Sequence, residues 1–278
     1  MRSEGRVPTG IEGLDELLNG GFPVDTVNLV SGPPGSGRSL FCMQFIYEGV
    51  EKFNEPGLYI TLEENHESLI KSMKSLGLKP EVYESEGDLI VADLGWFARE
   101  LGTAREPPAS LAGMDLLRER GRANRMDMDW LSAESDAQEE LERGFVGFRT
   151  LREVVGHMVE KRGVRRLAVD SVAAIGLMYD SPEVFRKELF TFGRFLRERR
   201  LTSVLVTETI GASNAVMFGV EHFLTDTHIS LNLRNVKGEF LRTISVQKMR
   251  FGRHDSGIHP FTITPRGLEI NTREYVVL

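Results

Sequence analysis

Cysteine is almost absent from this chain of 278 residues, in which Cys42 stands alone. A single cysteine excludes an internal disulfide framework, and its place in an apolar run predicts a small buried core residue. Long hydrophobic runs are missing too, since no stretch approaches the ~18–20 uninterrupted apolar residues of a membrane span. The first residues lead into no apolar segment of the kind that a secretory signal carries. We therefore expect a cytoplasmic protein with no membrane association.

Basic charge is also scarce. Lysine and arginine number 34 against 41 aspartate and glutamate, which gives a formal net charge of −7. This acidic balance argues against a body-wide nucleic-acid surface, although a local basic loop stays open. The composition, 41% hydrophobic and 27% charged, is that of a globular protein with a full core. The length allows one large domain or two small ones.

Short apolar runs alternate with helical patterns along most of the chain. Helical spacing of Ile11, Leu14, Leu17 and Leu18 predicts a first helix, which ends at residues 20–23. Strands are then expected at residues 26–30, 58–62, 89–93, 167–170 and 203–207, and helices at 40–46, 68–76, 148–161 and 184–199. This alternation predicts an α/β fold with a mainly parallel sheet flanked by helices on both faces.

The pattern changes after residue 219. Residues 228–233, 240–246 and 261–264 read as strands joined by short turns, with a hairpin turn at 237–239. We therefore expect the sheet to end in an antiparallel C-terminal extension. No second domain and no internal repeat is recognisable, so a single domain over residues 1–278 is predicted.

Residues 95–147 interrupt this domain. They contain Pro107 and Pro108, many charges of both signs, no lysine and no clear strand. A structureless loop of this length is unusual in a compact domain, and residues 111–120 and 132–143 are candidate helices. We interpret the segment as a variable surface insertion, with a lid or a partner-docking arm as the alternative.

A phosphate-binding loop is the most informative motif. Residues 32–39 read G-P-P-G-S-G-R-S, which fits the pattern G-x-x-x-x-G-K-[ST] except at its lysine. Such loops curl successive backbone N–H groups around an anion, and the following helix adds its positive end. A predicted strand, the loop and a predicted helix follow in that order, which favours nucleotide binding over an ordinary turn. The expected nucleotide contacts are Gly32, Pro34, Gly35, Ser36, Gly37, Arg38, Ser39 and Leu40.

Arg38 stands where the motif has lysine. A guanidinium keeps the positive charge, but it presents a broad planar fork in place of a compact ammonium. Ser39 is expected to ligate Mg²⁺. Nucleotide binding is therefore predicted, whereas the rate of any hydrolysis is in question.

Acidic residues follow several predicted strands. Asp170 ends an apolar strand in the manner of a Walker B aspartate that serves the metal, rather than a simple helix cap. Glu63 and Glu64 end another strand and are candidates to activate water, although adjacent acids are commonly just solvated. Glu208 ends a third and is placed to sense the γ-phosphate. Ligands of open parallel sheets lie beyond the carboxyl ends of the strands, where all of these acids are expected.

Two cations, Lys248 and Arg250, lie two residues apart on a predicted strand and therefore share one face. Such pairs are usually exposed charge. The alternative is a finger role, in which cations reach the γ-phosphate of a neighbouring subunit.

Together these segments resemble the KaiC-like branch of the RecA-type ATPases over nearly the whole chain outside residues 95–147. The resemblance rests on the opening residues 9–23, the pair Glu63-Glu64, the strand 167–171, and the runs 219–227, 248–255 and 259–264. It implies a RecA-type P-loop core and a ring, usually a hexamer, with ATP or ADP and Mg²⁺ between subunits. It also implies that Lys248 and Arg250 act across that interface.

Three departures limit what this resemblance implies. Arg38 replaces the loop lysine, and the chain has one such domain where the circadian clock protein of the family has two. His222 and Phe223 stand where the clock protein has its adjacent phosphorylated Ser and Thr, so autokinase and clock functions are not expected.

Three functions therefore compete. The first is a regulatory ring ATPase of slow turnover, the second a DNA-binding recombinase paralogue, and the third a non-hydrolysing scaffold that docks a protein partner. The excess of acidic residues counts against the DNA-binding paralogue. The presence of the acids and cations that hydrolysis needs counts against the non-hydrolysing scaffold, whereas Arg38 favours it. We rank them in this order.

Overall fold

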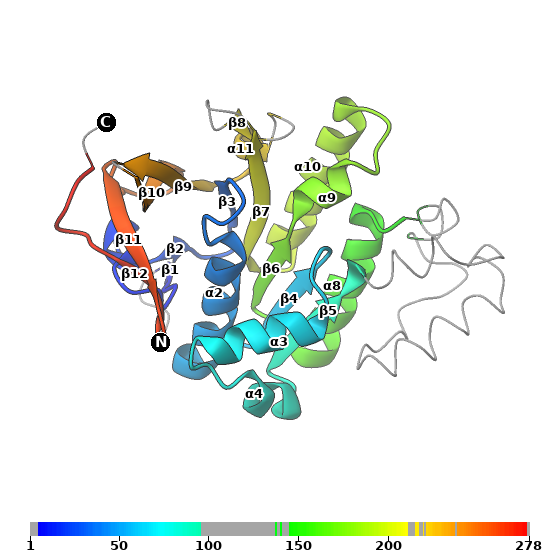
Figure 1. The fold of residues 1–278 in the computed structure, drawn as a ribbon. Helices are drawn as coiled ribbons and strands as arrows, with labels where there is room; N and C mark the ends of the chain where they lie inside the picture. Colours follow the sequence, from blue (N-terminus) through cyan, green and yellow to red (C-terminus); the bar gives the residue numbers. More distant parts are fainter. Residues whose placement is uncertain are drawn as a thin grey trace.

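The computed structural model describes residues 5–95, 137, 140, 145–210, 215–216, 219, 221–236 and 238–276. Its centre is one large twisted sheet (Figure 1). The order of its main strands is β12-β11-β10-β9-β3-β7-β6-β4-β5, and β8 (Ala215–Val216) pairs with β7. In chain order the main strands are β3 (Val27–Gly32), β4 (Gly57–Thr61), β5 (Leu89–Asp93), β6 (Arg166–Asp170), β7 (Thr202–Ile210), β9 (Thr227–Val236), β10 (Glu239–Met249), β11 (Ile258–Thr264) and β12 (Gly267–Ile270).

The sheet has a parallel part and an antiparallel part. Strands β5, β4, β6, β7, β3 and β9 pair in parallel, and β9 through β12 pair as antiparallel neighbours. The turn at Gly238, with φ of 92°, joins β9 to β10 as the predicted hairpin. Both the mainly parallel sheet and its antiparallel C-terminal extension are thus confirmed.

Helices cover the sheet on both faces because its central strands are apolar on both sides. Along β6, Leu167 and Val169 pack with α8 (Phe148–Arg162) and α10 (Pro182–Glu198), whereas Ala168 between them packs with α2 (Arg38–Phe53). This alternation is the two-residue period of a strand. The other long helix, α3 (His66–Ser75), lies on the α2 side with the shorter α4 (Pro80–Glu86).

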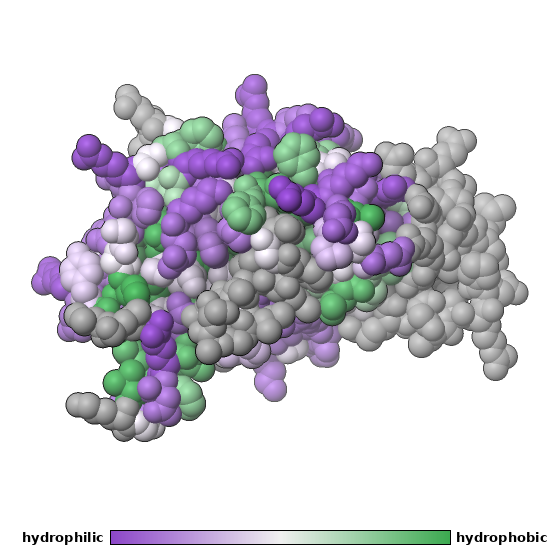
Figure 2. Space-filling view, turned by 90° about the horizontal axis from the view of Figure 1, so that it is seen from above, coloured by the Kyte–Doolittle hydropathy of each residue, from purple (hydrophilic) through white to green (hydrophobic). Residues whose placement is uncertain are grey.

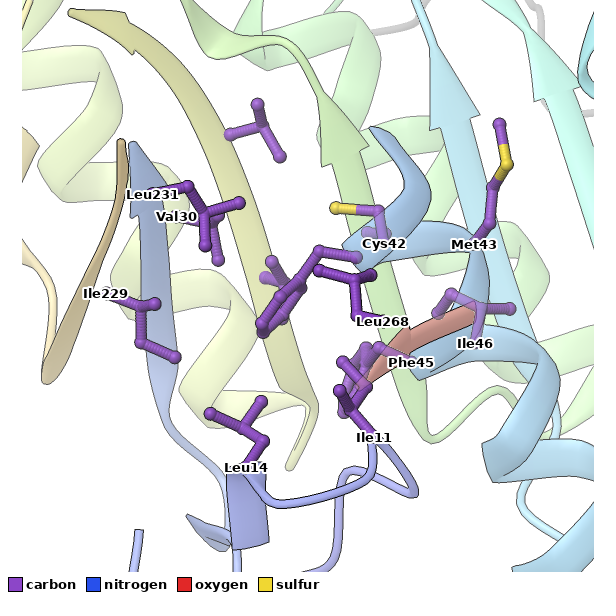
Figure 3. Close-up of a cluster of buried hydrophobic side chains, with 14 of the residues drawn as sticks. Ile11, Leu14, Val30, Cys42, Met43, Phe45, Ile46, Ile229, Leu231 and Leu268 are labelled. Carbon is purple, nitrogen blue, oxygen red and sulfur yellow. The ribbon is translucent and has the colours of Figure 1, made fainter. Parts of the chain in front are cut away.

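The N-terminal segment is tied to α2 and the C-terminal strands through the second core. Figure 3 shows Ile11 beside Phe45 of α2, with Leu14, Ile229 of β9 and Leu268 of β12 in the same cluster. All five side chains are almost completely buried. The ends of the sequence thus help to hold α2, and with it the glycine-rich loop, against the sheet.

The first predicted helix is shorter than its apolar spacing suggested. Helix α1 covers Leu14–Leu17 only, and Gly13 at its N-cap has φ of 81°. That left-handed conformation cannot continue a helix from Ile11. Short elements that the sequence patterns did not predict are β1 (Arg6–Val7), β2 (Phe22–Pro23), α4, α9 (Val172–Gly176), α11 (Glu221–Leu224) and β12.

The predicted insertion at residues 95–147 lies largely outside the described residues, and so do its candidate helices apart from Ala137 and Glu140. Glu140 is 4% exposed, and its carboxylate accepts hydrogen bonds from the N–H groups of Gly147, Arg149 and Thr150 at 2.9–3.0 Å. It also accepts from the hydroxyls of Thr150 and Tyr179. Glu140 thus caps the open N-terminus of α8.

Within the described part of the chain, no helix is both long and apolar enough to cross a membrane.

Candidate functional site

The glycine-rich loop joins the end of β3 to the start of α2. Gly35 and Gly37 have φ of 78° and 98°, and the N–H of Ser36 donates to the Pro33 carbonyl at 3.2 Å. Gly37 is the N-cap of α2, and no side chain caps the helix there. The first N–H groups of a 16-residue helix therefore point into the loop without intrahelical partners. This arrangement binds anions such as phosphate.

Two features of the loop interior fit a phosphate group. The hydroxyl of Ser36 is buried and has no hydrogen-bond partner, although buried hydroxyls are normally paired. A Cβ on Gly32 would lie 2.5 Å from the Ser36 hydroxyl and 2.5 Å from the Leu231 carbonyl oxygen. Glycine at position 32 is therefore required by close packing, and the loop interior has an unused donor.

Arg38 lies at the mouth of this loop with its side chain only 12% exposed. Its Nη2 donates to Oε1 of Glu208 at 2.9 Å, whereas its Nη1 is buried without a hydrogen-bond partner. Glu208 is in register with Gly32 on the neighbouring strand β7. Glu208 of β7 thus holds the guanidinium through Nη2, whereas Nη1 has no hydrogen-bond partner.

The predicted Walker B aspartate, Asp170, ends β6 in register with Thr61 of β4. The Tyr59 hydroxyl donates to its Oδ2 at 2.7 Å, which fixes the direction of the carboxylate. The following residue, Ser171, donates its hydroxyl to Glu63 at 3.0 Å and accepts the N–H of Ala174 at the start of α9. Parallel pairing of β4 and β6 thus brings Glu63 and Asp170 to one end of the sheet.

The electrostatics of this end are those of crowded acids. Partial burial, Asp170 and Glu63 together raise the pKa of Glu64 above its ordinary value. Burial, followed by the charge of Asp170, also raises the pKa of the Tyr59 hydroxyl. Mutual repulsion of carboxylates favours a bound cation, and oxygen ligands are those that Mg²⁺ prefers. The hydroxyl of Ser39, in the first turn of α2, supplies a further oxygen donor.

The two predicted strand cations are held differently, since only Lys248 lies on β10, which ends at Met249, and Arg250 lies in the turn that follows. Lys248 donates from Nζ to the carbonyls of His222 and Thr225 at 3.0 and 2.6 Å, at the end of α11. Burial, together with Arg250, lowers the pKa of this lysine. Arg250 is 51% exposed, and its Nη1 lies 3.6 Å from Oδ1 of Asp226. Both cations therefore lie against the connection from α11 to β9, but Lys248 is the more firmly fixed.

The structure adds contacts that the sequence patterns did not indicate. Arg242 of β10 donates from Nε to the Gly35 carbonyl at 3.3 Å, and so supports the loop from the antiparallel strands. His228 of β9 lies with Nε2 2.8 Å from the hydroxyl of Ser31, next to the loop. Burial, with smaller effects of His222 and Lys248, lowers the pKa of His228 to about 4. An isolated arginine or histidine on a strand carries no signal of such a contact.

The parallel strands run toward the top of the view in Figure 1, and Figure 2 looks onto that end of the molecule. Its visible surface is mostly hydrophilic, with separate apolar side chains set among polar ones. The polar character agrees with the acids Glu63, Glu64 and Asp170 at the ends of β4 and β6, whereas Lys248 lies beside the start of β9 and β3, at the other end of the sheet.

The acids at the ends of β4 and β6 are joined by Glu208, which lies inside β7 and not at its predicted end, because this strand continues to Ile210. A parallel sheet with such acids and an anion-binding loop after β3 defines the class of RecA-type P-loop ATPases. Comparison with known proteins gives the particular family. The family described as "ATPase: KaiC" matches residues 7–106 and 108–275. The chain therefore belongs to the KaiC family of ATPases.

Individual relatives agree with this assignment. The UPF0273 protein MK0039 of Methanopyrus kandleri is 34% identical over 275 residues, which cover 98% of this chain and 94% of that protein. The circadian clock oscillator protein KaiC of Synechococcus elongatus is 31% identical over 95% of this chain, but this match covers only 44% of the clock protein. The crystal structure of the KaiC-like protein PH0186 from Pyrococcus horikoshii matches 96% of this chain and 98% of its own, with a TM-score of 0.72 and 28% identity.

Proposed function

We propose that this protein binds Mg·ATP or Mg·ADP at its glycine-rich loop and hydrolyses ATP slowly, as a regulatory ring ATPase. The observation that carries the proposal is the loop itself. It combines an uncapped helix N-terminus, a buried Ser36 hydroxyl without a partner, and an unsatisfied nitrogen of Arg38. All three are donors, and they fit the oxygens of a nucleotide's phosphates.

The residues around the loop have separate roles in the proposed hydrolysis. Backbone N–H groups of residues 35–40 hold the phosphates, and Ser39 with Asp170 holds the metal. Bound Mg²⁺ would neutralise charge that develops on the phosphate oxygens. Glu64, with its raised pKa, and Glu63 are the candidates to accept a proton from the attacking water. The hydroxyl of Ser171, the residue after Asp170, donates to Glu63 and would hold it in place.

Slow turnover is proposed because of Arg38. Its guanidinium is bonded to Glu208, which directs part of its charge toward β7 and away from the reacting oxygens. Binding tolerates such a displacement, but the transition state is stabilised only where its charge develops.

Assembly into a ring, as a hexamer, is proposed with Lys248 and Arg250, at the end of β10 and in the turn after it, facing the nucleotide of the next subunit. Arg250 is the better candidate for this contact, because it is half exposed and its nearest described acid is 3.6 Å away. Lys248 is already bonded to two carbonyls of its own chain and would orient the segment that presents Arg250. An Arg250→Ala subunit mixed with a Glu63→Gln/Glu64→Gln subunit should recover activity at interfaces that combine an intact arginine with intact acids.

The direct test of hydrolysis compares the wild type with Glu63→Gln/Glu64→Gln. Loss of a general base commonly lowers a rate ~10²–10⁴-fold. We expect phosphate release to fall by that order, with ATP affinity in titration calorimetry nearly unchanged. Ser39→Ala should weaken only the Mg²⁺-dependent part of binding. Equal phosphate release by the wild type and the double variant would refute the assignment of the acids.

One alternative has support in a specific contact. The bond between Arg38 and Glu208 also suits a scaffold that holds ATP without hydrolysing it and docks a protein partner. A wild-type protein that binds ATP tightly and releases no phosphate over hours, alone and assembled, would favour the scaffold.

A further inference from the structure

The turn that follows β10 exposes an aromatic ring in an unfavourable backbone conformation. Phe251 directly follows Arg250 and is 74% exposed, the highest value among the large apolar side chains of the described residues. Its φ is 64°, in the left-handed region that bulky residues avoid. Neither the exposed ring nor this backbone conformation contributes to the stability of the isolated subunit.

The turn is nevertheless held firmly. Arg6, from β1, donates from Nη2 to the Phe251 carbonyl at 3.3 Å and from Nη1 to the Gly21 carbonyl at 3.2 Å. The same nitrogen lies 3.6 Å from the sulfur of Met249. A Cβ on Gly252 would collide with Nη2 of Arg6, so a larger residue there would displace this guanidinium from the turn.

Arg250 is fixed on the other side of the turn. Its N–H donates to the Asp226 carbonyl at 2.8 Å, and Asp226 also bonds Arg197 and the N–H of Val27 on β3. The backbone that presents Arg250 and Phe251 is thus anchored to the strand that leads into the phosphate loop. A turn with so many anchors has a defined conformation, so the exposure of Phe251 is built into the fold.

We propose that Phe251 packs on a second copy of this chain and positions Arg250 at that copy's nucleotide. The inference rests on the proposed ring, in which Arg250 acts across the interface. Because the two residues are adjacent and their backbone is anchored, a chain that packs on the Arg250 head meets the turn that exposes Phe251. An exposed aromatic between charged neighbours, Arg250 and Arg253, gains most from an apolar contact at an interface centre. A contact of this kind fixes the direction of a flexible arginine, whose rate contribution depends on placement.

The left-handed backbone of Phe251 allows a variant that removes the ring without straining the turn. Phe251→Gly removes the ring and relieves the backbone, so the subunit should fold with equal or higher stability. Asn54→Gly is the matched control, since Asn54 has φ of 53° after α2, far along the chain from this turn. We expect Phe251→Gly to lower kcat at least tenfold with a small change in KM, and Phe251→Leu, which keeps an apolar body, to restore most of it. Asn54→Gly should leave both constants unchanged.

Mixed assemblies separate a contact in trans from a local effect. Phe251→Gly subunits mixed with Glu63→Gln/Glu64→Gln subunits should regain activity, because the second kind supplies an intact Phe251 to the first. If Phe251 acted only inside its own subunit, mixing would restore nothing. Recovery with Arg250→Ala but not with Phe251→Gly refutes this inference alone, whereas recovery with neither refutes the proposed cation in trans.

A second readout does not depend on hydrolysis. Cys42, the chain's own cysteine, is fully buried, so a Phe251→Cys variant can be labelled selectively with an environment-sensitive fluorophore. The label should move to an apolar environment when Mg·ATP drives assembly, whereas a label at Phe190→Cys, on α10, serves as the comparison. Assembly without any change at position 251 would overturn the proposal. A change that needs another protein, and not a second copy, would overturn it as well.

Discussion

Arg38, the first residue of α2, and Glu208 of β7 form an ion pair, with 2.9 Å between Nη2 and Oε1. The pair joins the phosphate loop to β7 at the position where a compact cation would otherwise stand beside the phosphates. Both residues are predicted nucleotide contacts, yet in the structure they contact each other. We expect the rate of ATP hydrolysis to depend on how far a bound nucleotide breaks this contact.

Tyr59→Phe should raise the Mg²⁺ concentration needed for half-maximal activity, on the order of tenfold, because groups that orient metal ligands commonly have effects of this size. The Tyr59 hydroxyl fixes Asp170 at 2.7 Å. Tyr47→Phe is the matched control, since Tyr47 bonds Glu51 at 2.9 Å on α2, away from Asp170. The measurement is phosphate release against Mg²⁺ concentration, and identical curves for both variants would contradict the assigned role of Tyr59.

Lys248→Met should lower the free energy of unfolding by ~1–3 kcal/mol, because a charged donor to two carbonyls is lost. Arg250→Met should change it by less than ~1 kcal/mol, because its pair with Asp226 is long and half exposed. Urea denaturation measures both. The opposite order would mean that Arg250, and not Lys248, holds the end of α11.

Stability should decrease in acid partly through His228. Its pKa is lowered to about 4 from an ordinary 6.5, so the unfolded chain binds a proton more readily than the folded one between these values. The contribution of neutral His228 is therefore complete above pH 6.5 and is lost as the pH falls toward 4. His228→Gln, which keeps a polar partner for Ser31, should flatten the unfolding free energy over this window. An unchanged slope would contradict the burial of a neutral imidazole.

Glu140→Ala should destabilise the protein by ~2–4 kcal/mol, since several buried donors at the start of α8 lose their acceptor. Glu198→Ala is the control, because its pair with Arg194 is exposed on both sides. Thermal unfolding of both variants gives the comparison. Equal midpoints would mean that water replaces the carboxylate without loss.

The sequence predicted the sheet well because apolar strands and glycine stops are local signals. The strand at residues 167–170 is an example, because its apolar run and the single carboxylate that ends it are both evident in the amino-acid sequence. The boundary of α1 was missed because it depends on the left-handed backbone of Gly13, which spacing of leucines does not report.

Contacts between residues far apart in the sequence were the other feature that the sequence patterns did not predict. Arg38 and Glu208 are 170 residues apart, and only the register of β3 with β7 brings them together. The same holds for Arg242 at Gly35, which are 207 residues apart. Sequence spacing gave the candidate residues of the site, but the different contacts of Lys248 and Arg250 were visible only in the structure.

The rate of ATP hydrolysis by Arg38→Lys tests the central claim most directly. A lysine cannot reproduce the planar bond to Glu208 and places a compact charge nearer the phosphates. We predict a clearly higher kcat, with ATP affinity changed little, in phosphate-release assays at saturating Mg·ATP. A kcat that is unchanged or lower would show that the site is built around arginine, and would contradict slow turnover caused by Arg38.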